Sequence, residues 1–190
     1  MENIGDNGAV KIMLYETGIC ERIEPRMSRD NTPLILFVCT GNQIRSPLAA
    51  AIFKGHLTES GLQDSYRVES AGTWTLSGQS DPLARETALR MGLDIEEHRS
   101  RLIDRDLLLE ACLVIVMEQG QKEALEVEYP QVRGRVYLLS CLAGESSYNI
   151  PDPSGQGLEV YLRTGVELLG LIDSAFDTIC RILQDRNIYP

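Results

Sequence analysis

Residues 34–47 have the sequence LILFVCTGNQIRSP, which predicts a strand, a tight loop and the start of a helix in direct succession. The apolar run 34–38 is typical of a strand buried in a parallel sheet. Gly41 lies inside the loop, and the alanine-rich segment 48–53 continues as a helix that begins near residue 46. Cys39 therefore stands at the carboxyl end of a strand, and Arg45 stands where the helix begins.

This arrangement predicts an anion-binding loop that contains a nucleophile. The backbone N–H groups of such a loop converge on one point, and the amino end of the helix adds positive potential there. The same field favours the thiolate form of Cys39, while Arg45 can bind two oxygens of a tetrahedral oxyanion. We expect a phosphoryl group as the anion. The loop residues expected around it are Thr40, Gly41, Asn42, Gln43, Ile44 and Ser46.

The spacing between Cys39 and Arg45 is not informative alone, because the chain repeats it at Cys20 and at Cys180. Neither of these copies contains a glycine, and the one at Cys20 includes two glutamates where an anion would bind. Only the Cys39 copy follows an apolar strand and has glycine for close backbone approach.

Composition limits the classes of partner. The 190 residues carry a net charge of −10, which argues against nucleic acid and against an anionic membrane surface. The odd number of cysteines, five, indicates free thiols and a reducing compartment, so we expect a cytoplasmic protein. His56 and His98 are far apart in the sequence and belong to no metal-ligand pattern, so we expect no metal and no cofactor. The oligomeric state stays open.

Strands and helices alternate along the chain. Strands are predicted at about 34–38, 65–70, 112–117 and 136–139, and helices at about 46–60, 82–91, 104–109, in the segment that ends near 128, and at 158–185. This order predicts an α/β fold with a four-stranded parallel sheet and helices on both faces. We expect residues 34–190 to form the catalytic domain and residues 1–33 to form an extension of unknown role.

The loop between the fourth strand and the last helix supplies a candidate acid. Ligands of parallel sheets bind beyond the carboxyl ends of the strands, and this loop follows a strand at the same end as Cys39. Asp152 lies in it, before Pro153. An alkoxide or phenoxide leaves poorly, so a proton donor opposite the nucleophile is needed. An Asp-Pro pair also forms turns and helix caps, as we expect of Asp81 before Pro82.

Four motifs in sequence order resemble the low-molecular-weight protein tyrosine phosphatases. They are the loop at 38–47, Ser-Ala-Gly-Thr at 70–73, the segment from Gly92 through His98 to Arg101, and Asp-Pro at 152–153. The resemblance covers about 34–185 and implies hydrolysis of a phosphorylated protein, or of a small phosphomonoester, through a cysteinyl-phosphate. It implies Cys39 as nucleophile, Arg45 as phosphate clamp and Asp152 as general acid. The supporting polar network would be Asn42, Ser46, Ser70 and His98.

Departures from the family pattern leave the substrate open. Gln43 and Ile44 stand where many relatives have Ile or Thr and then a second cysteine, and no aromatic pair follows Pro153. These differences weaken the expectation of phosphotyrosine and keep a protein-arginine phosphatase as an alternative. Arsenate reduction needs two further cysteines that relay a disulfide. Cys112 lies within a strand and Cys141 is 29 residues later, which argues against that relay. A non-catalytic anion-binding module is the remaining alternative, although both Cys39 and Arg45 are present.

Overall fold

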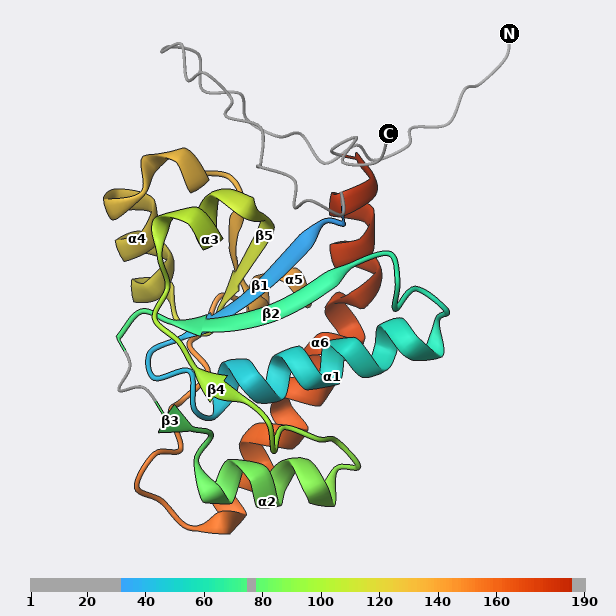
Figure 1. Cartoon of the computed structure of the whole chain (residues 1–190), viewed down its shortest axis with the longest axis vertical. Helices are drawn as coiled ribbons and strands as arrows, with labels where there is room; N and C mark the ends of the chain where they lie inside the picture. The colour runs from blue at the N-terminus through green and yellow to red at the C-terminus, as the bar shows by residue number, and fades with distance from the viewer. Residues whose placement is uncertain (1–31, 75–77, 186–190) are drawn as a thin grey trace, which may run out of the picture.

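The computed structural model describes residues 32–74 and 78–185 (Figure 1). Four parallel strands form the central sheet, as predicted, and their order in it is β2-β1-β5-β6. They are β1 (Leu34–Cys39), β2 (Arg67–Gly72), β5 (Ala111–Val116) and β6 (Val136–Leu138). The expected extension at 1–33, with Cys20, lies outside the described residues except for residues 32 and 33.

Helices cover both faces of this sheet. One face is covered by α1 (Arg45–Glu59), α5 (Leu139–Leu142) and α6 (Leu158–Asp185), and α2 (Pro82–Arg90) packs on α6, farther from the sheet. The other packs against α3 (Arg105–Glu110), α4 (Gln119–Glu128) and the short 3₁₀ turn η1 (Pro130–Val132). A separate two-stranded sheet joins β3 (Gly78–Gln79) to β4 (Arg99–Ser100). Strands of two residues leave no periodic pattern, so the sequence did not indicate them.

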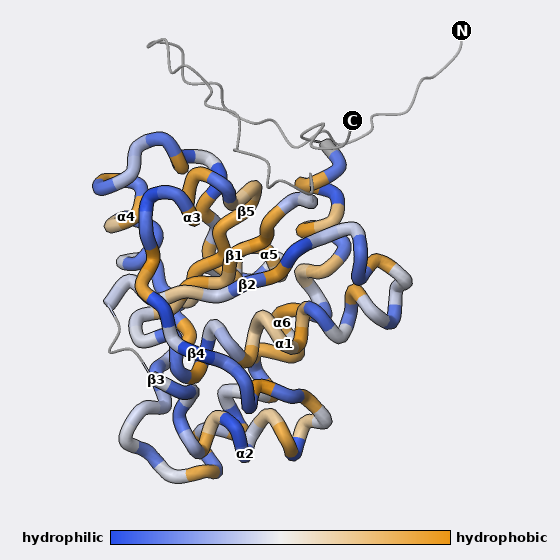
Figure 2. The backbone as a smooth tube through the Cα atoms, in the orientation of Figure 1, coloured by the Kyte–Doolittle hydropathy of each residue, from blue (hydrophilic) through white to orange (hydrophobic). Residues whose placement is uncertain are grey.

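Strand β1 divides the core into two layers. Ile35 and Phe37 face the layer that contains α1 and α6, whereas Leu36 and Val38 face the layer that contains α3 and α4. All four side chains are fully buried, and burying each contributes about 1.5–3 kcal/mol. Figure 2 shows β1 and β5 as apolar tubes through the middle of the molecule. This two-sided burial produces a continuous apolar run instead of an alternating one.

Strand β2 lies two residues later than predicted. It begins at Arg67, whose N–H donates to the Pro33 carbonyl at 2.9 Å, and it continues to Gly72, which pairs with Cys39. Alanine and glycine have low strand propensity, so the sequence suggested a loop from residue 71. The tertiary pairing with β1 overrides that propensity and places Gly72 beside the start of the loop that connects β1 to α1.

Helix α6 has the predicted bounds. Its sequence has apolar residues at helical spacing at Leu162, Val166, Leu169, Ile172, Phe176 and Ile179, yet the Val166 and Leu169 side chains are 65% and 37% exposed. The buried apolar positions are Tyr161, Leu168, Leu171, Ile172, Ala175, Ile179 and Leu183. Two rows of apolar residues along this helix both have helical spacing. Packing against α1, α2 and α5 decides which row is buried.

Segments that are distant in the chain meet at the carboxyl end of the sheet. The N–H of Ile150 donates to the Met117 carbonyl, directly after β5, at 2.9 Å. This bond holds the loop that carries Asp152 beside the strand ends. Asp81 caps α2, as expected, by accepting from the Leu83 N–H at 2.8 Å. No helix within 32–74 and 78–185 is long and apolar enough to cross a membrane.

Candidate active site

The turn between β1 and α1 wraps around the sulfur of Cys39. The Asn42 N–H donates to Cys39 Sγ at 3.3 Å, and the Ser46 hydroxyl lies 3.0 Å from the same sulfur. Ile44, the residue that precedes α1, offers no side-chain cap to the first turn, and that turn contains no acidic residue. The amino end of the helix therefore keeps its positive potential for a bound anion.

Asn42 holds this loop in shape. It is fully buried with a φ of 52°, a left-handed conformation that asparagine tolerates. Its side-chain amide donates to Ser46 at 3.0 Å and to Ser70 at 2.9 Å. Its side-chain oxygen accepts from the Arg101 N–H at 3.0 Å. The expected network of Asn42, Ser46 and Ser70 is therefore assembled in the structure, with Arg101 as an additional member.

His98 joins the same network through the backbone. Its Nε2 lies 2.8 Å from the Asn42 carbonyl oxygen, which also accepts from the Ser100 hydroxyl at 3.0 Å. Burial lowers the pKa of His98 below its usual 6.5, the bond to Asn42 opposes this shift, and nearby cations, Arg101 first, lower the pKa further. The imidazole is therefore neutral at neutral pH, with its Nε2 proton directed at the loop.

Arg45 connects the loop to two carboxylates. Its guanidinium is 1% exposed, and Nη1 donates to Glu118 at 2.6 Å and to the Ile150 carbonyl at 2.8 Å. Nη2 donates to Asp152 at 2.5 Å. The fork thus joins the end of β5 to the loop before α6. The structure brings the predicted clamp and the predicted acid into direct contact.

The Asp152 carboxyl is half-exposed and anionic. Burial would raise its pKa, but hydrogen bonds from Ser154 and the charge of Arg45 outweigh that effect and lower the pKa below the usual 3.8. The Ser154 hydroxyl donates to Asp152 at 2.6 Å, and the Ser154 N–H donates at 3.0 Å. These contacts favour the carboxylate form of Asp152.

Two residues of this site, Glu118 and Gln121, were not assigned a role from the sequence. Gln121 Nε2 donates to Thr40 Oγ1 and to Glu118 Oε1, both at 3.1 Å. Its Oε1 accepts from the N–H groups of Met117 and Glu118. Gln121 therefore fixes both the loop and the carboxylate that orients Arg45. Their position after β5, at the same edge of the sheet as Cys39, is the signal that could have found them.

The side chains of the loop are packed to different degrees. Ile44, a member of the expected anion-binding loop, has a side chain that is 5% exposed and packs in the core. A Cβ at Gly41 would meet no described atom within 4 Å. A close backbone approach within the protein is made at Gly72, between β2 and the loop, where a Cβ would lie 2.5 Å from the Thr40 carbonyl.

The described residues contain no group of three or more histidine, cysteine or acidic side chains that could hold a metal ion. Acidic and basic groups at the site are instead paired with one another, as Arg45 is with Glu118 and Asp152.

Comparisons with known proteins agree with this geometry. The family model described as low molecular weight phosphotyrosine protein phosphatase matches residues 34–181. A probable low molecular weight protein-tyrosine-phosphatase of Ralstonia nicotianae is 34% identical over 128 residues, which cover 67% of this chain and 82% of that protein. A protein-arginine-phosphatase of Bacillus subtilis is 32% identical over 139 residues, which cover 73% of this chain and 91% of that protein.

A solved structure shows the same fold. The low molecular weight protein tyrosine phosphatase from T. tengcongensis superposes with a TM-score of 0.72 at 33% identity. The superposition covers 77% of this chain and 99% of the other. The matched region contains the whole sheet and the loops that carry the candidate site, whereas residues 1–33 lie outside the family match.

Proposed function

Because this chain belongs to the low molecular weight phosphotyrosine protein phosphatase family, we propose that it hydrolyses phosphate monoesters on proteins, with phosphotyrosine as the first substrate. The observation that carries the proposal is the position of Cys39 Sγ in the loop, next to an arginine that contacts a carboxylic acid. A nucleophile, an oxyanion clamp and a proton donor are the three groups that this reaction requires.

In the first step, the Cys39 thiolate attacks phosphorus. The bond between phosphorus and the leaving oxygen breaks, and protonated Asp152 gives its proton to that oxygen. Arg45 and the amino end of α1 stabilise the charge on the phosphoryl oxygens. The product of this step is a cysteinyl-phosphate and a free alcohol or phenol.

In the second step, water attacks the phosphorus of the cysteinyl-phosphate. The Asp152 carboxylate accepts a proton from that water, the bond between phosphorus and sulfur breaks, and inorganic phosphate leaves. Ser46, whose hydroxyl lies 3.0 Å from Cys39 Sγ, stabilises the departing thiolate by donating a hydrogen bond. The enzyme returns to its starting protonation state.

Substrate binding changes the state of Asp152. A phosphoryl group in the loop competes with Asp152 for the guanidinium of Arg45, because both are anions at the same fork. A dianion beside the carboxyl also raises its proton affinity. When phosphate binds, Asp152 therefore takes up a proton from solvent and becomes the proton donor of the first step; it returns this proton to solvent after phosphate has left.

A protein-arginine phosphatase is the second candidate. It is favoured by the relative of that name in Bacillus subtilis and by the segment 154–157, which has no aromatic side chain to stack on a phenol ring. Arsenate reduction is less well supported. Cys112 is 1% exposed inside β5, whereas Cys141 is exposed on α5. These positions do not support a disulfide relay between Cys39 and the two cysteines.

None of the four described cysteines, Cys39, Cys112, Cys141 and Cys180, is part of a disulfide. This supports our proposal of a reducing, cytoplasmic location.

A peptide panel tests the proposed activity. Peptides that carry phosphotyrosine, phosphoserine or phosphoarginine are compared for release of phosphate by the wild type and by Cys39→Ser. We expect the phosphotyrosine peptide to have the highest kcat/KM, and we expect Cys39→Ser to lose turnover while it still binds vanadate. Preference for phosphoarginine would select the second candidate. Turnover by Cys39→Ser would remove this residue as nucleophile and overturn the proposed mechanism.

A further inference from the structure

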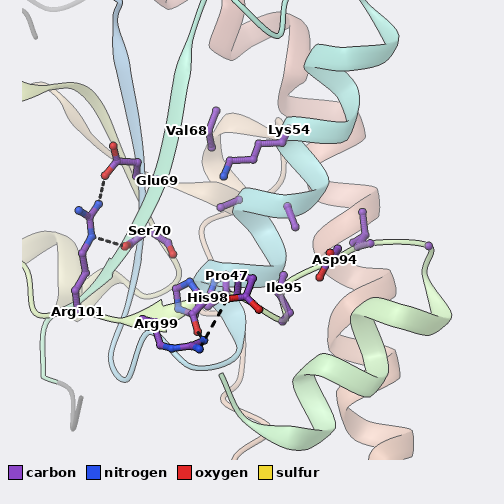
Figure 3. Close-up of a pocket in the computed structure, with 15 residues that line it drawn as sticks. Pro47, Lys54, Val68, Glu69, Ser70, Asp94, Ile95, His98, Arg99 and Arg101 are labelled. Atoms are coloured by element: carbon purple, nitrogen blue, oxygen red, sulfur yellow. Dashed lines mark hydrogen bonds and ion pairs between the residues drawn. The ribbon is translucent and has the colours of Figure 1, made fainter. Parts of the chain in front are cut away.

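A second cavity, of about 560 Å³, lies behind the phosphate loop (Figure 3). It is bounded by α1, by β2 at the edge of the sheet, and by the segment 92–101. Cys39, Arg45 and Asp152 are not among its lining residues. Its apolar lining is contributed by Pro47, Ala50, Ala51, Val68, Leu93 and Ile95. This volume is in the range of small-molecule sites in proteins.

The charged side chains of this cavity differ in whether they have a partner of opposite charge or a hydrogen bond. Arg101 is paired with Glu69, and the Asp94 carboxylate accepts from the Glu96 N–H at 2.8 Å. Lys54, by contrast, has no ion pair with any residue that the structure describes, and Figure 3 shows it reaching from α1 toward Val68.

The second weakly paired cation is Arg99. Its Nη2 lies 3.9 Å from Glu97, a carboxylate that is 92% exposed, while its Nη1 donates to two carbonyl oxygens. Pairs of this kind at the surface contribute little. Lys54 and Arg99 thus retain capacity to bind an anion.

The electrostatic surroundings of His98 agree with a site for an anion. His98 lines the cavity, and the charged groups that act on its imidazole are Arg101, Lys54 and Arg99, all of them cations. Three carboxylates also line the cavity: Glu69 is paired with Arg101, Asp94 accepts from the Glu96 N–H, and Glu97 is 92% exposed and lies 3.9 Å from Arg99. A negative charge placed beside His98 would therefore be attracted by this group of side chains.

We propose that this cavity is a second anion site, that it takes a small organic carboxylate with an apolar body, and that its occupant changes oxyanion binding at the phosphate loop. The apolar lining would bury the body of the ligand, and its carboxylate would bind to Lys54 or to Arg99, which Figure 3 places at opposite ends of the cavity. The phosphate loop differs in that it binds its anion with a helix end and a buried arginine.

Two lining residues connect the cavity to the loop. Ser70 Oγ accepts from the Asn42 side chain at 2.9 Å, and His98 Nε2 lies 2.8 Å from the Asn42 carbonyl. Asn42 in turn donates its N–H to Cys39 Sγ. A ligand that packs against Ser70 and His98 therefore acts on the residue that shapes the loop. Coupling of this kind is reciprocal, so an oxyanion in the loop must change the affinity for the carboxylate by the same factor.

Titration of ¹⁵N-labelled protein with benzoate tests the site. We expect the largest amide shifts at residues 50–54, 68–70 and 92–99. Lys54→Met or Arg99→Met, whichever removes the cation that the carboxylate binds, should weaken benzoate binding by about tenfold, the loss of one charge-assisted contact. Lys122→Met, on α4, is the matched control and should bind as the wild type does. Largest shifts at residues 40–46, or equal affinity in all four proteins, would overturn the proposal.

A second variant and a second ligand complete the test. Ala51→Leu fills the cavity without changing charge and should also weaken benzoate binding. Saturating vanadate should change the benzoate Kd, and saturating benzoate should change the vanadate Kd by the same factor. Unchanged constants would refute the coupling. Because these measurements record binding without turnover, their failure would leave the proposed hydrolase activity intact, and failure of the peptide panel would leave this site intact.

Discussion

Arg45 Nη2 lies 2.5 Å from the carboxylate of Asp152, although 107 positions separate the two residues in the sequence. The contact is made while Nη1 of the same guanidinium donates to Glu118. The proposed clamp and the proposed acid are therefore held together before a substrate arrives. The guanidinium of Arg45 is therefore already oriented when a phosphoryl group enters the loop. In our proposal, the phosphoryl group displaces the Asp152 carboxylate, which is the next proton donor.

Replacement of Asp152 should affect substrates according to their leaving group. Asp152→Ala should slow hydrolysis of an alkyl phosphate or of an unactivated aryl phosphate by about 10²–10⁴, because the departing oxygen receives no proton. The loss should be smaller for phenols of low pKa, which leave without help. Measurement of kcat across a series of substituted phenyl phosphates tests this. A uniform loss across the series would contradict acid catalysis and indicate that Asp152 only orients Arg45.

Asp152 should also make stability depend on pH. Its folded-state pKa lies below the usual 3.8, so the folded state favours the carboxylate. The stabilisation is fully present above the unfolded pKa and is lost as the pH falls through the lowered folded value. The difference in free energy of unfolding between the wild type and Asp152→Asn should therefore be largest at neutral pH and should shrink below about 3.8. Urea unfolding at several pH values provides the measurement, and a constant difference would refute the pairing.

Gln121 should matter both for stability and for substrate binding. Gln121→Leu leaves the buried N–H of Met117 without its acceptor, which should lower the free energy of unfolding by about 1–3 kcal/mol. It also releases Glu118 and Thr40, so Arg45 is less well oriented and kcat/KM should fall by up to about 10²-fold. Gln119→Leu is the control, because the Gln119 amide donates to Glu123 at the surface of α4. Equal behaviour of the two variants would show that Gln121 does not orient the loop.

Gly72 should not tolerate a methyl group. Because the added Cβ of Gly72→Ala would lie 2.5 Å from the Thr40 carbonyl, β2 or the phosphate loop must move, at a cost of about 1–3 kcal/mol. Vanadate affinity should fall as well, since Thr40 begins the loop. The control is Gly170→Ala in α6, where the new Cβ meets no described atom within 4 Å and should stabilise the helix by about 1 kcal/mol. Chemical denaturation and vanadate titration measure both effects.

Local patterns predicted most of the elements. The apolar run 34–38 identified β1, and the order of strands and helices predicted the parallel sheet. The same patterns did not decide which residues of a helix are buried or where a strand ends, because more than one arrangement fitted them equally well. Val166 fits a helical stripe but is exposed, and residues 71–72 have loop-like composition but extend β2. In each case the deciding contacts come from another element, which a local pattern does not contain.

The sequence by itself determined the loop chemistry, because a strand, a tight turn and a helix that follow one another directly can place Cys39, Asn42 and Arg45 in only a few ways. Only the tertiary structure decided what surrounds them. Glu118, Gln121 and Asp152 reach the loop from other strand ends, and His98 reaches it from the segment beyond α2. The physical reason is that hydrogen bonds and ion pairs depend on distances of about 3 Å in space, and the folding of the sheet, not the order of residues, sets those distances.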